Sequence, residues 1–357
     1  MKSRTALIER FKASLNDVSP AMRASVNRIG GLSEDALLGL IINPYDSCVD
    51  GPHHPQDSIV EKQYDADLCF EFGQTALQSG EVAYCILAGG VGTRIGEPKA
   101  LLRLPNSGMS LLTLKLFQAN GTGPIWILTS PSLRAAVESH VFSIAGIDLT
   151  RIRIVEQYES YRLTPDNQIF FSDGVPNLYP CGHGDIFPAL TTTGVLRQFV
   201  NEGGKYVAVV NADNIMASLD PFIVGRHIIC NANVSCEVVE RSDEDAGGVL
   251  CIDRGQLQIV ESYRIRNANA KEFKWLNTNS LIFNANLNIE PLGNSWNRVQ
   301  KIINDNVVIQ HERLLQEITE AYNTFFFKSE RSERFFPIKN SADLKAADEK
   351  VDVKNIL

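Results

Sequence analysis

An apolar run from Val82 to Leu87 leads directly into a glycine-rich, cationic loop, AGGVGTRIGEPK, that ends at Lys99. The run predicts a buried strand. The four glycines of the loop let backbone N–H groups approach a phosphate chain, and Arg94 and Lys99 can neutralise its oxygens. A strand that ends in such a loop predicts an α/β protein with a site for a nucleoside triphosphate or a similar polyanion.

Strands and helices alternate after this loop, as they do in a doubly wound, mostly parallel sheet whose ligands bind at the carboxyl ends of the strands. We expect strands at 82–88, 124–129, 152–156 and 206–211. We expect helices at 110–119, 131–143 and 186–201, with Ser130 as the N-cap of the second and Pro131 at its first position.

The pattern changes at residue 234. Consecutive strands are predicted at 234–240, 248–253, 256–263 and 275–283, with a hairpin turn at Asp253–Gly255. The tail from about 296 is predicted to be mostly helical, with a last strand at 335–339. Before the first strand, helices are predicted at 5–17, 34–42 and 65–78.

Composition narrows the class of partner. The 357 residues carry a formal net charge of −8, and the 34 Lys and Arg residues are spread along the chain. No basic run indicates nucleic-acid or membrane binding, so we expect neither partner. An acidic protein that handles phosphates must recruit a cation, which favours Mg²⁺ as a cofactor. The seven cysteines form no CxxC pair and no apolar signal or membrane span is evident, which indicates a reducing, cytoplasmic compartment.

The glycine-rich loop has a competing interpretation as a dinucleotide site. That fingerprint requires GxGxxG, whereas Gly90, Gly92 and Gly96 give GxGxxxG. The loop also lacks the GKS or GKT of a Walker loop. Its two cations favour a nucleotidyltransferase loop over a dinucleotide site.

Two further motifs carry polar groups at strand ends. In YPCGHGDIFPAL, the glycines beside His183 allow a close backbone approach to a ligand, and Asp185 is placed to cap the following helix. The alternative is a capped loop in which His183 is a structural hydrogen-bonding group. In YVAVVNADN, a strand ends at Asp213, where a carboxylate can hold Mg²⁺ beside phosphates. The alternative there is a polar strand end that begins a turn.

These three motifs, in this order, resemble the eukaryotic-type UDP-glucose pyrophosphorylase family, also called UTP–glucose-1-phosphate uridylyltransferases. The likeness continues with Val260-Glu261, with the segment FKWLNTN at 273–279 and with RFFPIK at 334–339. It covers roughly residues 82–345. The resemblance implies a nucleotide-diphospho-sugar transferase fold with a small β-rich sugar-binding elaboration. The implied reaction joins UTP and a hexose 1-phosphate, with glucose 1-phosphate expected, into a UDP-sugar and pyrophosphate.

The resemblance also implies domain limits. It predicts an N-terminal helical extension over residues 1–80, a catalytic domain over 81–345 with its sugar-binding part at about 234–290, and a tail over 346–357. The chain ends soon after Lys339, so we expect no room for the family's C-terminal β-helix, and the oligomeric state is not predicted.

Roles for single residues follow only from the resemblance. The catalytic cations would be Arg94, Lys99 and Lys339, and Asp213 would be the Mg²⁺ ligand. The nucleotide would be bound by Leu87, Ala88, Gly89, Gly90, Gly92, Thr93, Gln157 and Gly182, with Gln157 at the uracil edge. The sugar phosphate would be bound by His183, Gly184, Asn211, Glu261, Asn277 and Asn279. Outside this pattern, Gln157 and Lys339 are each typical of solvated surface residues.

Departures from the family pattern keep other functions open. Only Glu97 separates Gly96 from the Pro-Lys pair, a short loop that is similar to those of molybdenum-cofactor guanylyltransferases, so another nucleotide is an alternative. Ser280 replaces the last residue of the family's NTNN, which predicts the loss of a sugar-facing amide and allows another sugar 1-phosphate. The GHGD form favours a plain hexose. A non-catalytic nucleotide-sugar-binding protein is the third alternative.

Overall fold

The computed structural model describes residues 4–28, 31–42, 48–90, 97–119, 121–289, 292 and 296–350. A central sheet has the strand order β12-β11-β14-β9-β2-β3-β4. The four strands β9 (Tyr206–Asn211), β2 (Val82–Leu87), β3 (Ile125–Thr129) and β4 (Ile152–Glu156) are mutually parallel. Strand β2 is buried along its whole length, as its apolar run predicts. The expected α/β fold class is therefore confirmed.

The sheet continues beyond β9 with antiparallel strands. Strand β14 (Trp275–Asn284) runs antiparallel to β9 and also pairs with β10 (Val234–Glu240) and β11 (Gly248–Asp253). Strand β11 forms a hairpin with β12 (Gln256–Glu261), and its two-residue turn has positive φ at Arg254 and Gly255. The predicted hairpin is therefore confirmed. Such a turn requires positive φ at both central residues, and the glycine of the DRG sequence adopts it at one of the two positions without strain.

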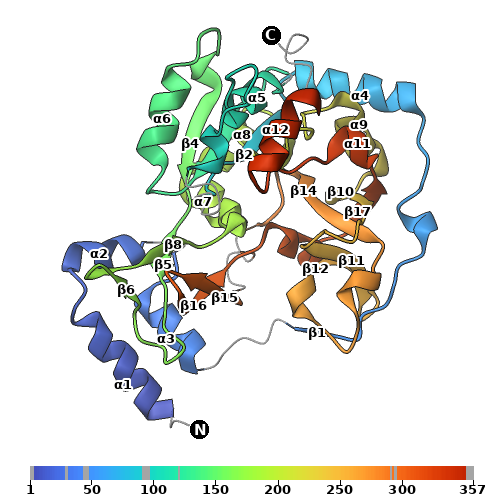
Figure 1. The fold of residues 1–357 in the computed structure, drawn as a ribbon. Helices are drawn as coiled ribbons and strands as arrows, with labels where there is room; N and C mark the ends of the chain where they lie inside the picture. Colours follow the sequence, from blue (N-terminus) through green and yellow to red (C-terminus); the bar gives the residue numbers. More distant parts are fainter. Residues whose placement is uncertain are drawn as a thin grey trace.

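Helices cover both faces of the sheet (Figure 1). The covering helices are α4 (Ala66–Gln78), α5 (Leu111–Phe117), α6 (Arg134–Phe142), α7 (Ile186–Thr192), α8 (Val195–Asn201) and α9 (Pro221–Cys230). Helix α12 (Ser341–Lys350) packs in a smaller cluster with α5. Helices α4 and α9 touch at glycines, because a Cβ at Gly73 would lie 1.8 Å from the Pro221 carbonyl oxygen. Two large apolar clusters fill the space between sheet and helices.

A second group of elements lies below the carboxyl ends of the parallel strands (Figure 1). It contains helices α1 (Arg4–Leu15), α2 (Pro20–Val26) and α3 (Glu34–Ile42) and three small hairpins. The hairpins pair β5 (Glu159–Tyr161) with β8 (Leu178–Pro180), β6 (Phe171–Ser172) with β7 (Val175–Pro176), and β15 (Asn297–Ile303) with β16 (Asn306–Glu312). The remaining elements are β1 (Val49–Asp50), β13 (Ile265–Arg266), β17 (Thr324–Lys328), α10 (Ile318–Ala321) and α11 (Arg331–Arg334).

Three predictions of local structure were wrong. The tail after 296 is not mostly helical, because β15, β16 and β17 occupy much of it, and β17 adds to the sheet beside β10. The segment 335–339 is not a strand; only Pro337 forms a bridge, with Asn214. The helix expected at 186–201 is broken into α7 and α8, because Gly194, with a φ of 74°, is the N-cap of α8 and not a helical residue. The strands in the tail depend on pairing between segments, and local sequence propensity does not predict such pairing.

The capping prediction at Ser130 was also wrong. Helix α6 begins at Arg134, and residues 131–133 form a turn in which the Leu133 N–H donates to the Ser130 carbonyl oxygen. No helix of the described residues is long and apolar enough to cross a membrane.

Candidate active site

The carboxyl ends of β2 and β9 form one side of a cleft of about 370 Å³. Its lining includes, from the predicted site, Leu87, Ala88, Gly89, Gly90, Lys99, Gln157, Gly182, His183, Asn211 and Asp213. Since these residues come from four separate chain segments, the fold brings the three sequence motifs together as the topology of a parallel sheet predicts. Gly92, Thr93 and Arg94 lie outside the described residues.

A cation and a carboxylate meet at the base of this cleft. The Lys99 Nζ lies 2.8 Å from Asp213 Oδ2, and both side chains remain partly exposed. Lys99 begins a short 3-10 turn, and its N–H donates to the Gly90 carbonyl oxygen. The loop that follows β2 therefore returns its lysine to the end of β9.

Gln157 lies against the backbone of Gly89. Its Nε2 donates to the Gly182 carbonyl oxygen at 2.8 Å, and its Oε1 is buried with no hydrogen-bond partner among the described residues. A Cβ at Gly89 would lie 1.9 Å from that Oε1. Position 89 thus requires a glycine to leave room for the amide, and Gln157 is 5% exposed rather than a solvated surface residue.

His183 is held in one tautomer. The Leu315 N–H donates to its Nδ1 at 2.8 Å, so a neutral ring carries its proton on Nε2. Burial lowers the pKa of His183, although the Glu312 and Asp213 carboxylates act in the opposite direction. The ring is therefore a neutral donor near the cleft at physiological pH.

The glycines beside His183 serve a purpose that the sequence did not indicate. A Cβ at Gly182, whose φ is 103°, would lie 2.4 Å from the Arg313 carbonyl oxygen, and one at Gly184 would lie 2.6 Å from the Leu314 N. Both glycines thus admit the chain that follows β16, and Gly184 is not among the residues that line the cleft.

The expected helix cap at Asp185 was wrong. Asp185 makes no side-chain capping bond to α7. Its buried carboxylate accepts hydrogen bonds from the Tyr158 N–H at 2.8 Å and from Arg313 at 2.7 Å. This aspartate therefore anchors the chain after β16 to the end of β4.

The β15–β16 hairpin supplies cleft residues that the sequence reasoning missed. Lys301, Gln310 and Glu312 line the wall of the cleft, together with Arg162 and Tyr179. Arg162 donates to Gln310 at 3.0 Å, Gln310 donates to Glu312, and Lys301 lies 3.8 Å from Glu312. The missed signal was the Asn304-Asp305 pair between two segments that contain several Val and Ile residues, since both residues of this pair have positive φ, as a two-residue hairpin turn requires.

The other predicted sugar-facing residues lie outside the cleft lining. Glu261 accepts a hydrogen bond from Gln316 at 2.5 Å. Asn277 and Asn279 bond to each other, with the Asn279 N–H donating to Asn277 Oδ1 at 3.0 Å.

Lys339 lies 3.6 Å from Asp245, while the backbone N–H of the preceding Ile338 donates to the Asp213 carbonyl oxygen. The late lysine is thus adjacent to the Asp213 strand end, with its side chain paired elsewhere.

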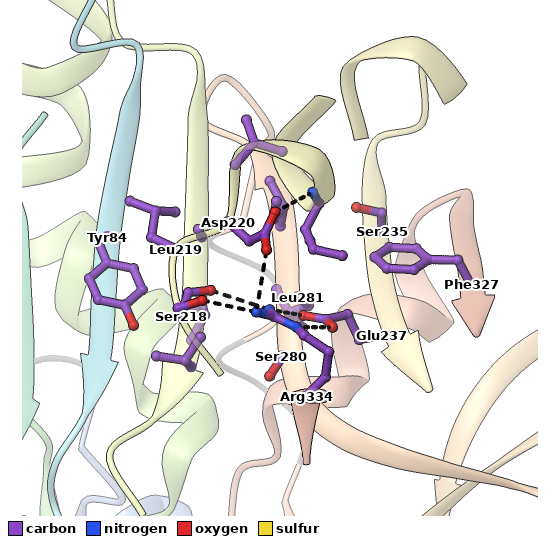
Figure 2. A pocket seen from close by; sticks show the side chains of 16 residues that line it. Tyr84, Ser218, Leu219, Asp220, Ser235, Glu237, Ser280, Leu281, Phe327 and Arg334 are labelled. Atoms are coloured by element: carbon purple, nitrogen blue, oxygen red, sulfur yellow. Dashed lines mark hydrogen bonds and ion pairs between the residues drawn. The ribbon is translucent and has the colours of Figure 1, made fainter. Parts of the chain in front are cut away.

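The interpretation of Ser280 as a sugar-facing position was wrong. Its side chain is 2% exposed and lines an interior cavity of about 20 Å³ with Glu237 and Arg334 (Figure 2). Asn277 and Asn279 precede Ser280 at an irregularity of β14, where Asn279 has a φ of 56°, and neither asparagine lines this cavity. A substitution at position 280 therefore changes the packing around this buried cavity and not a surface that contacts the sugar.

Residues 56–351 match the family described as UTP–glucose-1-phosphate uridylyltransferase. The chain belongs to this family.

Curated family members include the UTP–glucose-1-phosphate uridylyltransferases of Musa acuminata, 27% identical, and Hordeum vulgare, 29% identical. The first alignment covers 96% of this chain and 76% of the relative, and the second covers 72% and 59%. The family membership therefore rests on most of this chain, while the Hordeum vulgare protein is considerably longer than the matched stretch.

Solved structures share the fold. A UDP-N-acetylglucosamine pyrophosphorylase from Trypanosoma brucei, in complex with an inhibitor, gives a TM-score of 0.74 at 20% identity and covers all of this chain and 89% of its own. A variant UDP-glucose pyrophosphorylase from Leishmania major, in complex with UDP-glucose, gives 0.68 at 19% identity, with 94% and 78% covered. At these identities the likeness establishes the fold alone.

Proposed function

We propose that this chain joins UTP and glucose 1-phosphate into UDP-glucose and pyrophosphate. One observation carries the proposal. This chain, which belongs to the family, places the Lys99–Asp213 pair, Gln157 and His183 around one cleft at the carboxyl ends of the parallel strands. The hexose 1-phosphate is the finer part of the proposal, and the GHGD motif supports a plain hexose.

The reaction needs no covalent nucleophile from the protein. A phosphate oxygen of the sugar phosphate attacks the α-phosphorus of UTP, and pyrophosphate leaves from the opposite side. The chain must align two anions that repel each other and must stabilise charge on the phosphoryl oxygens. In this proposal Lys99 supplies positive charge at the base of the cleft. His183 donates from Nε2, and Gln157 and the backbone at 87–90 hold the nucleoside.

The donor set of the cleft fits a magnesium ion. Mg²⁺ beside phosphates takes one or two protein carboxylates and completes its shell with phosphate oxygens and water. Among the described residues no group of three or more metal-ligating side chains occurs. The cleft lining contains two carboxylates, Asp213 beside Asn211 at the end of β9 and Glu312 on the hairpin wall. We propose that Asp213 would hold this ion, which would supply charge neutralisation between the two substrates.

Substitution of Asp213 by Asn tests the proposal. The wild-type chain, assayed with Mg²⁺, is expected to release pyrophosphate only when a nucleoside triphosphate and a sugar 1-phosphate are both present. Asp213→Asn and removal of divalent cations with EDTA are each expected to lower kcat at least about 100-fold, because one charge-stabilising contact is typically worth 10²–10³ in rate. Circular dichroism should show an unchanged fold.

The substrates are identified by a matrix of four triphosphates against several sugar 1-phosphates. A maximum at UTP and glucose 1-phosphate supports the proposal. A maximum elsewhere assigns the same reaction to another nucleotide or sugar. If the chain binds nucleotide sugars but turns over no pair of substrates, the proposed enzymatic activity is contradicted and the chain is a nucleotide-sugar-binding protein.

The compartment is a separate part of the proposal. The described residues contain no disulfide, and five cysteines are buried as small apolar side chains, at positions 69, 85, 181, 236 and 251. These observations support a reducing compartment such as the cytoplasm.

A further inference from the structure

The chain directly after β16 contacts two predicted substrate-binding side chains through consecutive residues. The Leu315 N–H donates to His183 Nδ1 at 2.8 Å, and the Gln316 side chain donates from Nε2 to Glu261 Oε1 at 2.5 Å. One short 3-10 turn, Leu315–Glu317, therefore orients two side chains that are both predicted to bind the sugar phosphate.

Gln316 is a buried glutamine whose side chain bonds to the carboxylate of Glu261. Its side chain is 1% exposed, and its Oε1 is buried with no partner among the described residues. A buried glutamine that leaves its carbonyl oxygen unpaired is costly, since such a group forfeits its hydration without replacement. The hydrogen bond to Glu261 is the polar contact that its side chain does make.

Charged groups from β15, from β16 and from the 3-10 turn after β12 act on the carboxylate of Glu261. Burial raises its pKa, and the Glu312 carboxylate acts in the same direction. The Gln316 hydrogen bond and the Arg264 and Lys301 cations lower it. Glu312 and Lys301 also line the cleft. Geometrically, Glu261 is connected to the cleft through the turn, because Gln316 bonds to Glu261 and the preceding Leu315 bonds to the cleft residue His183.

We propose that Gln316 is a positioning residue that fixes the carboxylate of Glu261 for the sugar hydroxyl groups of the sugar 1-phosphate. The proposal rests on the proposed function. Gln316 occupies Oε1 of the carboxylate and leaves Oε2 to accept from a hydroxyl. It also opposes the burial that favours the protonated acid, and a protonated acid is a weaker acceptor. No residue motif pointed to this role, because Gln316 and Glu261 are 55 positions apart.

A methionine at position 316 separates this role from a purely structural one. Gln316→Met keeps an unbranched side chain of similar length but removes the donor to Glu261. The KM for the sugar 1-phosphate is expected to rise about tenfold, the scale of a hydrogen bond to a charged group, while the KM for UTP stays unchanged. The acid limb of kcat/KM for the sugar 1-phosphate should move to higher pH, because a contact that lowers the pKa of Glu261 is lost.

Gln258→Met is the matched control. Gln258 is also a buried glutamine, 4% exposed, that donates to a carboxylate, Asp253, at 3.3 Å in the same β11–β12 hairpin. Its variant should lose comparable stability in thermal unfolding but leave both KM values and the pH profile unchanged. Equal effects of the two variants on catalysis would overturn the positioning role.

Gln316→Glu provides a second variant. The carboxyl group that it introduces can still donate to Glu261 when it is protonated, whereas the ionised form repels that carboxylate. We therefore expect near-normal affinity for the sugar 1-phosphate at low pH and a growing KM as pH rises. A flat KM across pH, or equal increases for UTP and sugar 1-phosphate, would contradict the inference. Absence of turnover by the wild-type chain would instead contradict the proposed function.

Discussion

Gly89 has no Cβ, and the predicted nucleotide site depends on this. The Gln157 amide occupies the space where a side chain at position 89 would lie, because its Oε1 would be 1.9 Å from a Cβ there. Gly89→Ala must therefore displace Gln157. We expect it to raise the KM for UTP at least about tenfold and to cost about 1–3 kcal/mol of stability, as overpacking does. Steady-state kinetics and urea unfolding measure the two effects.

Gly39→Ala is the control for this substitution, because a Cβ there meets no atom within 4 Å. It lies in helix α3, where alanine is the better helix former. In a Gly89→Ala/Gln157→Ala double variant, the stability cost of Gly89→Ala should largely disappear. If that cost persists without the Gln157 amide, another contact is responsible.

At the scale of an element, the turn Leu315–Glu317 contains a buried acid. Glu317 is 5% exposed, and burial raises its pKa from 4.5 to about 8, against a hydrogen bond from Asn297. The folded chain therefore keeps a proton that the unfolded chain loses. This contribution to stability is complete below about pH 4.5 and is lost as pH rises towards 8.

Glu317→Gln mimics the protonated acid at every pH. Its free energy of unfolding should exceed that of the wild type by roughly 5 kcal/mol at pH 8.5 and match it at pH 4, since folding raises the pKa from 4.5 to about 8 and each pKa unit corresponds to about 1.4 kcal/mol. Urea unfolding at the two pH values measures the difference. The same difference at both values would show that Glu317 does not titrate in this range.

At the scale of the whole molecule, one buried ion pair joins the C-terminal part of the chain to the sheet. Arg334 donates to both carboxylate oxygens of Glu237 on β10 at 2.9 and 2.8 Å, and it also contacts Ser218 (Figure 2). Glu237→Gln leaves the buried guanidinium with only the more distant Asp220 carboxylate, 4.0 Å away, as a counter-charge. We expect a loss of about 3–5 kcal/mol, together with reduced turnover because the backbone at Ile338 bonds to Asp213.

A double-mutant cycle with Arg334→Met measures the coupling of this pair. Replacement of both partners by neutral side chains should recover much of the stability, since the desolvation of two charges is then avoided. Additive losses in the double variant would mean that the two residues act independently. Turnover should follow the stability of the C-terminal segment rather than the charge at position 334.

The sequence by itself determined the parallel half of the sheet and the residues at its carboxyl ends. Apolar runs such as Val82–Leu87 specify strands locally, and βαβ connectivity then brings the ends of β2 and β9 to one edge. For that reason Lys99, His183 and Asp213 were indicated by motifs in the sequence, whereas Gln157 was indicated only by the resemblance to the family. Their separations along the chain do not matter once the strand order is known.

Only the tertiary structure decided which distant segments complete the site. The β15–β16 hairpin and the turn Leu315–Glu317 reach the cleft because Gly182 and Gly184 leave space for a backbone, and that fit depends on both segments at once. The face on which Ser280 lies depends on strand register, and the partner of Lys339 depends on docking of the C-terminal segment. Such contacts form between residues far apart in the chain, and local patterns carry no record of them.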